Sequence, residues 1–126
     1  EKFYLTCQEV DTPDKTPIRD YIDVVDLNLA HLKAVEYLFK NKKSEIINLG
    51  TGTGSSVLEV VNQVKKLTGV EIPVEKGNTR SGDDAKKIAD ITKAEKLLGW
   101  KPSKTIVDSV KSLIVWYKNH PQGWKS

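Results

Sequence analysis

Residues 46–57 read Ile46-Ile47-Asn48-Leu49-Gly50-Thr51-Gly52-Thr53-Gly54-Ser55-Ser56-Val57, an apolar run followed by three alternating glycines. The adjacent isoleucines predict a strand over residues 45–49 with both faces covered, as in a parallel sheet. Residues 56–59 have the form of a capping box, which predicts that a helix begins here. A strand, a glycine loop and a helix in this order indicate an α/β chain, and they also resemble the start of a dinucleotide-binding unit.

The spacing of the glycines does not fit a dinucleotide-binding fingerprint. That motif needs a third glycine three residues after the second, and an acid about 20 residues further on for the ribose. Whichever pair of glycines is counted, the third position holds Ser55 or Val57, although Glu75 could supply the acid. We therefore interpret the loop as a structural turn, and keep a nucleotide- or anion-binding module built on it as the alternative.

Downstream of the loop, the pattern predicts three helices and one strand. Valines and a leucine between residues 57 and 67 form one helical stripe that stops at Gly69, and a strand is expected over residues 70–75. Asp90 is the expected cap of a short helix that ends at Gly99, with Trp100 folding back on its last turn. Thr105 and Asp108 predict a final helix over residues 106–119, whose buried residues would be Ile106, Val110, Leu113 and Tyr117.

Upstream of the loop, the pattern is a strand over residues 2–6, a turn-rich segment over residues 11–17, and a second strand over residues 19–24. Asp26 is the expected cap of a helix over residues 27–40. His31 falls beside the apolar face of that helix, and we interpret it as an ordinary helix residue and not as a ligand or a base.

Composition excludes several classes of function. A net charge of +3 with scattered lysines gives no basis for nucleic-acid binding. The longest apolar run, residues 113–117, is far shorter than the roughly 20 residues that span a bilayer.

The one cysteine, Cys7, can form no internal disulfide, so we expect a cytoplasmic protein. Methionine is absent and residue 1 is glutamate, from which we expect the chain to be a fragment of a longer protein.

Two arginines are the strongest candidates for a binding function. Of the twenty basic residues only Arg19 and Arg80 are arginine, and each lies in a polar connection near an aspartate, Asp20 or Asp83. A guanidinium can hold two phosphate oxygens at once, which an ammonium cannot. The residues alone leave two readings open: the arginines bind an anion, or each pairs locally with its aspartate. We find no nucleophile with a base and no metal-ligand spacing, so catalysis by these residues alone is not expected.

Several motifs together resemble the C-terminal part of the UDP-glucose 4-epimerases, which belong to the extended short-chain dehydrogenase/reductase family. The similarity extends over nearly the whole chain, and its most specific part is Thr-Pro-Asp followed by Arg-Asp-Tyr-Ile. The motifs are Asp11-Thr12-Pro13-Asp14, Ile18-Arg19-Asp20-Tyr21-Ile22, Asp26-Leu27, Ala30-His31-Leu32, Asn48-Leu49-Gly50, Ser56-Val57-Leu58, Arg80-Ser81-Gly82-Asp83, Ala89-Asp90, Leu98-Gly99-Trp100 and His120-Pro121-Gln122-Gly123.

The resemblance implies an α/β fold with about four helices and short strands, in which residues 1–126 form a single C-terminal substrate-binding domain without the Rossmann core. It implies that Arg19 and Arg80 contact the diphosphate of UDP-glucose or UDP-galactose, and that Asp83 helps to hold the nucleotide. The family's NAD and its catalytic tyrosine and lysine would belong to an upstream domain, so this chain alone is expected to be inactive. An apolar strand without its neighbours would favour self-association or a homodimer.

The sequence departs from the family pattern at five positions. Cys7 and Lys15 stand where the family usually has glycines, and Val10 replaces a usual tyrosine. Asp23 replaces a common histidine, and Lys87 stands where an aromatic residue often follows the Arg-x-Gly-Asp turn. A diverged, inactive copy of the epimerase is therefore a second alternative.

Overall fold

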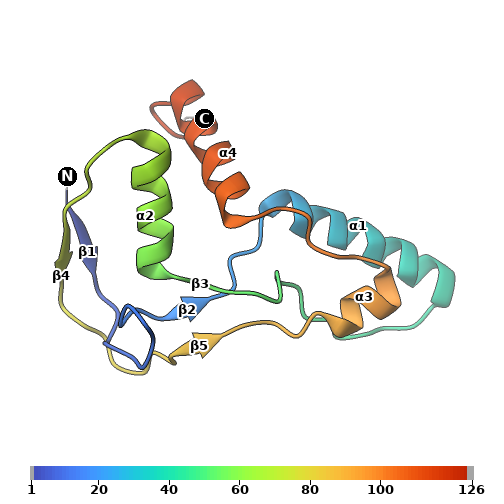
Figure 1. The fold of residues 1–126 in the computed structure, drawn as a ribbon. Coiled ribbons are helices and arrows are strands. Elements are labelled where there is room, and N and C mark those ends of the chain that lie inside the picture. Colours follow the sequence, from blue (N-terminus) through green and yellow to red (C-terminus); the bar gives the residue numbers. More distant parts are fainter. Residues whose placement is uncertain (1, 125–126) are drawn as a thin grey trace.

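The structure, a computed structural model, describes residues 2–124. Four helices and five short strands follow one another along the chain. They are β1 (Phe3–Leu5), β2 (Ile18–Arg19), α1 (Val24–Asn41), β3 (Ser55–Ser56), α2 (Val57–Thr68), β4 (Val74–Lys76), β5 (Lys86–Lys87), α3 (Thr92–Leu98) and α4 (Ile106–Asn119). Figure 1 shows α1 and α3 side by side at one end of the molecule, with α2, β1 and β4 at the other. The predicted α/β class with four helices is confirmed.

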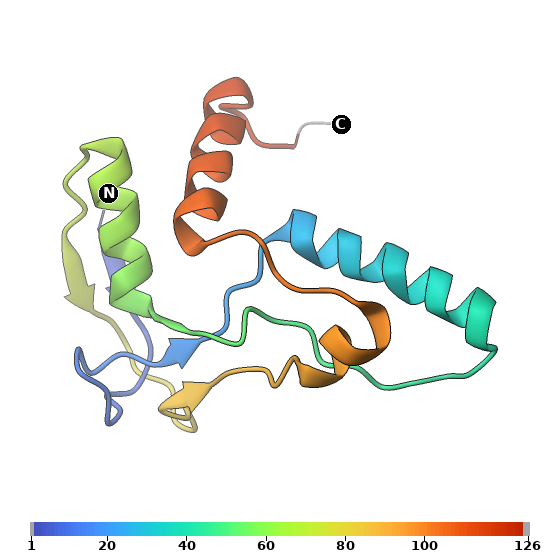
Figure 2. The same cartoon turned by 45° about the vertical axis from the view of Figure 1, so that its right-hand side comes forward.

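The strands form two small sheets. β1 and β4 pair in parallel, with Phe3 opposite Val74. In the second sheet β2 lies in the middle, antiparallel to β3 and parallel to β5. Figure 2 shows this second sheet connecting the two ends of the molecule. The pairing of β2 with β5 places Arg19 opposite Lys87. The loop that leads into β5 therefore ends beside β2.

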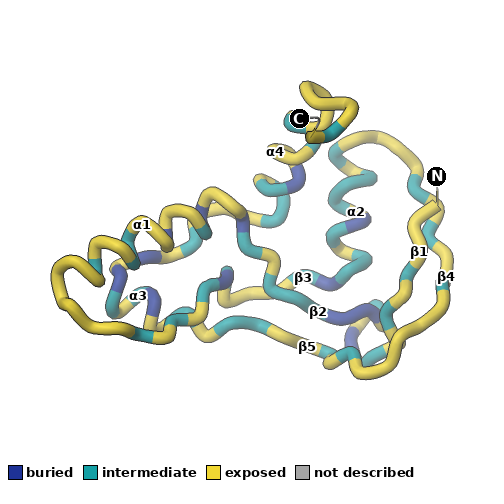
Figure 3. Tube along the Cα trace, turned by 180° about the vertical axis from the view of Figure 1, so that it is seen from behind, coloured by how far each residue is buried: buried dark blue, intermediate teal, exposed yellow. Residues whose placement is uncertain are grey.

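The main core joins α1 to α3 and to Trp100. Ala30, Ala94, Leu98 and Trp100 are buried together, and the Trp100 indole Nε1 donates to the backbone oxygen of Asp26 at 3.1 Å. Gly99 has the left-handed φ of +59° that ends α3 and turns Trp100 back onto the helix, as predicted. Figure 3 shows that buried segments are few and that much of α1 faces solvent.

The start of α1 differs from the prediction. Asp23, and not Asp26, caps the helix: its Oδ1 accepts from the Val25 amide at 2.8 Å, and its Oδ2 accepts from the Ser109 hydroxyl at 2.6 Å. The strand expected over residues 19–24 is limited to Ile18–Arg19, because the chain then turns into the helix. Asp23 thus joins α1 to α4.

Asp26 is buried in the first turn of α1, where it holds a distant loop. Its carboxylate accepts from the Ser103 amide, the Ser103 hydroxyl and the Lys104 amide, each at 2.8 Å. Both Asp23 and Asp26 have the chemistry of a helix cap. The donors at residues 103 and 104 are found only after the chain has folded, so the sequence pattern could not choose between the two aspartates.

Three further local predictions were wrong. Residues 45–49, all of which the structure describes, form no strand, since no strand among residues 2–124 lies beside them. The strand expected over residues 70–75 begins only at Val74. The cap residue of α3 is Ile91, although the Asp90 carboxylate accepts from the Thr92 amide at 2.9 Å.

Helices α2 and α4 both begin with the predicted capping boxes. Ser56 and Glu59 close one of them, and Thr105 and Asp108 close the other. The two helices border an apolar groove of about 640 Å³. Val110 is buried, as predicted. Because the groove is open to solvent, Leu113 and Tyr117 are 55% and 59% exposed, and the burial predicted for these two residues was wrong.

Candidate functional site

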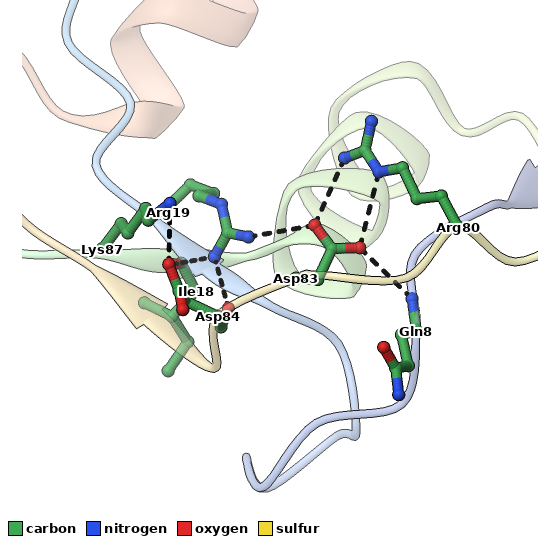
Figure 4. Close-up of polar contacts among 7 residues, drawn as sticks. All are labelled: Gln8, Ile18, Arg19, Arg80, Asp83, Asp84 and Lys87. Carbon is green, nitrogen blue, oxygen red and sulfur yellow. Dashed lines mark hydrogen bonds and ion pairs between the residues drawn. The ribbon is translucent and has the colours of Figure 1, made fainter.

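The loop between β4 and β5 brings Arg80 and Asp83 to the end of β2, where Arg19 lies. The Asp83 Oδ1 accepts from Nη2 of Arg19 at 3.3 Å and from Nη2 of Arg80 at 3.4 Å. Nε of Arg80 lies 3.5 Å from the Asp83 Oδ2. Figure 4 shows the two guanidinium groups on either side of the Asp83 carboxylate. We refer to Arg19, Arg80 and Asp83 as the arginine cluster.

Backbone groups fix two members of the cluster. The Asp83 Oδ2 accepts from the Gln8 amide at 3.3 Å, which connects the loop to the segment after β1. Nη1 of Arg19 donates to the backbone oxygens of Ile18 and Asp84, both at 2.9 Å. Because one edge of the Arg19 guanidinium is occupied by carbonyl groups, its orientation is set by the backbone of β2 and of the loop that precedes β5 (Figure 4).

The two arginines differ strongly in exposure. The side chain of Arg80 is 73% exposed and that of Arg19 is 27% exposed, while the Asp83 side chain is 8% exposed. An exposed arginine on an ion pair of this length is weakly held, so Arg80 can change partners at little cost in free energy. Arg19 is the fixed part of the cluster and Arg80 is its adjustable part.

The cluster carries a net positive charge. Burial raises the pKa of Asp83, but the hydrogen bonds from Gln8 and Arg80 and the charges of both arginines outweigh it and hold that pKa below its ordinary value. Asp83 is therefore ionised at neutral pH and balances one of the two guanidinium charges. The remaining charge and the N–H groups of Arg80 suit an anion with several oxygens, such as a phosphate.

Arg19 does not pair with Asp20, which was one of the two local pairings considered. The Asp20 carboxylate instead accepts from the Thr51 amide at 2.7 Å, the Thr51 hydroxyl at 2.5 Å, the Gly52 amide at 3.2 Å and the Ala89 amide at 3.1 Å. The N–H groups of the glycine loop thus hold a carboxylate of the protein itself. These contacts agree with the interpretation of the loop as a structural turn.

Sequence reasoning did not anticipate two contributions to this region. Gln8 acts through its backbone amide, which any residue except proline provides, so no side-chain signal exists. Asp20 bonds to residues 31 and 69 positions further along the chain, and no local pattern indicates such partners.

One residue near the site has an unusual backbone conformation. Lys15, which stands where the resemblance leads us to expect glycine, has a φ of +63°, in the left-handed region that side chains disfavour. It borders a cavity of about 330 Å³ with Cys7 and Lys76. Lys15 therefore adopts a backbone conformation that glycine adopts at a lower cost in free energy.

Other kinds of site find no support in the described part of the chain. Among residues 2–124, no three His, Cys, Asp or Glu side chains come together in a way that could hold a metal ion. No helix within the same residues has both the length and the apolar content needed to cross a bilayer. His31 is exposed on α1, as expected for an ordinary helix residue.

Comparison with known proteins gives a consistent result. Residues 7–113 match the profile of the GDP-mannose 4,6 dehydratase family. The UDP-glucose 4-epimerase of Lactobacillus helveticus is 43% identical over 125 residues, which are 98% of this chain and 38% of that protein. The UDP-glucose 4-epimerase of Bacillus subtilis is 40% identical over 91% of this chain and 34% of its own length.

Solved structures show the same relationship. A crystal structure of UDP-glucose 4-epimerase superimposes with a TM-score of 0.93 at 37% identity, over all of this chain and 39% of that one. The enzyme of Bifidobacterium longum, in complex with NAD+ and UDP, gives a TM-score of 0.83 at 40% identity, over 98% of this chain and 36% of that one. The chain thus spans less than two fifths of the length of these relatives.

Proposed function

The chain belongs to the GDP-mannose 4,6 dehydratase family and resembles the C-terminal part of UDP-glucose 4-epimerase, and on this basis we propose that it forms the UDP-sugar-binding part of such an epimerase. In the longer protein the reaction would interconvert UDP-glucose and UDP-galactose through a 4-keto intermediate, with NAD as the cofactor. Residues 1–126 would act as a single substrate-binding domain. Alone, they would bind the nucleotide without catalysing the isomerisation.

The arginine cluster is the observation that supports this proposal most strongly. The two arginines of the chain, far apart in sequence, meet on one buried carboxylate, and one of them is largely exposed. In the proposal, Arg19 is fixed and presents its charge to one phosphate. Arg80 turns from Asp83 toward the second phosphate. When no ligand is bound, the Asp83 carboxylate offsets the repulsion between the two guanidinium charges.

NAD would be held mainly by the rest of the longer protein. The glycine loop of this chain does not suit the pyrophosphate of a dinucleotide, because the amides of Thr51 and Gly52 already donate to Asp20. We therefore assign residues 46–57 no part in cofactor binding. The same contacts weigh against the alternative of an anion-binding module built on this loop.

A replacement of the adjustable arginine tests the proposal. Hydrogen bonds to charged groups contribute about 1.5 to 3 kcal/mol each. Arg80→Ala should therefore raise the dissociation constant for UDP about tenfold or more, as measured by titration calorimetry. Lys111→Ala removes an exposed cation of α4 and serves as the control for a general loss of positive charge. An unchanged affinity of Arg80→Ala would show that the cluster does not bind UDP.

A variant at Gly54 distinguishes our proposal from the alternative of an anion-binding module built on the glycine loop. A side chain at Gly54 would come within 2.5 Å of the Ile18 side chain and 2.8 Å of the Ile88 side chain. In our proposal Gly54→Val loses UDP binding only together with the fold, as seen by circular dichroism. Loss of binding by a fully folded Gly54→Val protein would favour the alternative.

Two properties outside the site are also part of the proposal. We infer a cytoplasmic location from the single cysteine. We infer self-association because α1 presents a second apolar face to solvent, with Val25, Leu32 and Phe39 all more than half exposed. A third possibility, a purely structural or interaction domain, predicts that the unaltered chain does not bind UDP even at millimolar concentration.

A further inference from the structure

Asp20 lies next to Arg19 in sequence, but its contacts lead elsewhere in the fold. Its carboxylate bonds to the glycine loop through Thr51 and Gly52, and to the segment after β5 through the Ala89 amide. One side chain thus connects the end of β2 to two other segments. The second of these is the continuation of the strand that follows Asp83 and Asp84.

The pairing of β2 with β5 is too short to fix this arrangement by itself. It contains two residue pairs, of which the second is Arg19 with Lys87. The Ile18 amide donates to the Ala85 oxygen at 2.9 Å at one end of the pair, and the Asp20 carboxylate accepts from Ala89 at the other. Arg19 lies between these two connections.

Gly50 provides the room that Asp20 needs. A Cβ atom at Gly50 would collide with the Asp20 carboxylate and would lie 2.7 Å from the Ala89 Cβ. Burial raises the pKa of Asp20, but the hydrogen bonds from Thr51, Ala89 and Gly52 outweigh it and keep that pKa below its ordinary value. The Asp20 carboxylate is therefore charged at neutral pH when it accepts the hydrogen bonds from Thr51, Gly52 and Ala89.

We propose that Asp20 is a positioning residue for the arginine cluster: it sets the distance between β2 and the Asp83 segment, so that the Arg19 guanidinium meets Asp83. Gly50, the first glycine of the loop, leaves room for the Asp20 carboxylate beside Ala89 and does not bind a cofactor. The geometric part of the inference stands on the contacts of Asp20 alone, and its consequence for UDP rests on the proposed function.

Arginine side-chain NMR provides a direct test, because the chain contains only two arginines. The Nε–H signals of Arg19 and Arg80 can be assigned with an Arg80→Lys variant. In Asp20→Asn, an NH₂ group replaces one of the two acceptors, so some of the four hydrogen bonds are lost. We expect the Arg19 signal to move toward its position in Asp83→Asn. The Arg80 signal should stay, since Arg80 reaches Asp83 from three residues away in the same loop.

Asp26→Asn is the matched control. It alters another aspartate that accepts from backbone amides, but its donors are Ser103 and Lys104, which bond neither to Asp20 nor to the arginine cluster. It should lower the melting temperature and leave both arginine signals in place. An Asp20→Asn protein that is folded but keeps the Arg19 signal of the unaltered chain would overturn the proposal, and would reduce Asp20 to a stabiliser of the turn.

A UDP titration separates this inference from the proposed function. If the unaltered chain binds UDP, Asp20→Asn should raise the dissociation constant at least threefold, and an equal affinity would count against a positioning role. If the unaltered chain does not bind UDP, the proposed function fails and the NMR result still decides the geometry. Should Asp20→Asn not fold, Thr51→Ala removes one donor to Asp20, together with the contacts of that hydroxyl with Thr53, and should move the Arg19 signal less, in the same direction. No movement there would also refute the inference.

Discussion

Two aspartates whose side chains are little exposed, Asp26 and Asp83, organise two regions of this molecule in different ways. Asp26 is 1% exposed and accepts from the backbone amides of Ser103 and Lys104, beside the Trp100 core. Asp83 accepts from one backbone amide, that of Gln8, and otherwise from the side chains of Arg19 and Arg80. Both carboxylates are satisfied, but the first is bound by groups that cannot leave without unfolding the chain.

The difference shows how one type of residue serves either structure or binding. Backbone donors belong to the fold, so a carboxylate that they hold is fixed for as long as the fold persists. An exposed guanidinium can exchange a carboxylate for a phosphate, because both are anions of suitable geometry. We therefore expect variants at the Asp26 end to change stability, and variants at the Asp83 end to change binding.

The largest effect is expected at Trp100, whose side chain is 2% exposed at the centre of the core. Trp100→Ala should lower the free energy of unfolding by about 3–5 kcal/mol, as burial is lost and a cavity forms. Urea denaturation followed by circular dichroism measures this change. A loss below about 1 kcal/mol would mean that this end does not carry the stability of the chain.

Asp26→Asn should lower the free energy of unfolding by about 2 kcal/mol at neutral pH, since charge-assisted hydrogen bonds are lost. Burial raises the pKa of Asp26, but the bonds from Lys104 and Ser103 outweigh it, so that pKa lies below its ordinary value. The stabilisation is therefore present above the unfolded-state pKa of about 3.9 and is lost as the pH falls through the folded-state pKa.

Denaturation of both proteins between neutral pH and strong acid checks this dependence on pH. The unaltered chain and Asp26→Asn should differ most near neutral pH and converge in acid. A constant difference across the whole range would show that the charge of Asp26 does not contribute.

Lys15→Gly should raise the free energy of unfolding by about 0.5–1 kcal/mol, because it relieves a left-handed φ at a small cost in chain entropy. The turn is held by Asp14, whose Oδ1 accepts from the Thr16 amide at 2.9 Å, so it should not change shape. Thermal denaturation measures the gain. Lys66→Gly, inside α2, is a matched control that should destabilise the chain.

The smallest change in stability is expected for Arg80→Ala, the variant proposed to lose UDP affinity. Exposed ion pairs contribute little, so the free energy of unfolding should change by less than about 0.5 kcal/mol. Urea denaturation of the same sample used for calorimetry checks it. A large loss would remove the contrast between the two ends, because the cluster would then be part of the stabilising structure.

The sequence by itself determined those features whose hydrogen bonds close within a few residues. The capping boxes at Ser56 and Thr105 and the left-handed glycine at Gly99 were predicted correctly, since donor and acceptor lie within one helical turn. The resemblance to the epimerases also identified the three members of the cluster as candidates. That both arginines bond to the Asp83 carboxylate was not predicted, because the residues indicated only anion binding or pairing of each arginine with the aspartate near it in sequence.

Tertiary structure decided the features that depend on distant partners. Asp26 became the centre of a junction and Asp23 the helix cap, because the donors of Asp26 lie 77 and 78 residues further along the chain. Residues 45–49 have the composition of a strand, but a strand needs a neighbour, and none lies beside them among residues 2–124. Asp20 follows the same rule. Its charge is visible in the sequence, but only the fold brings Thr51, Gly52 and Ala89 to it. The amides of the glycine loop therefore bind the Asp20 carboxylate.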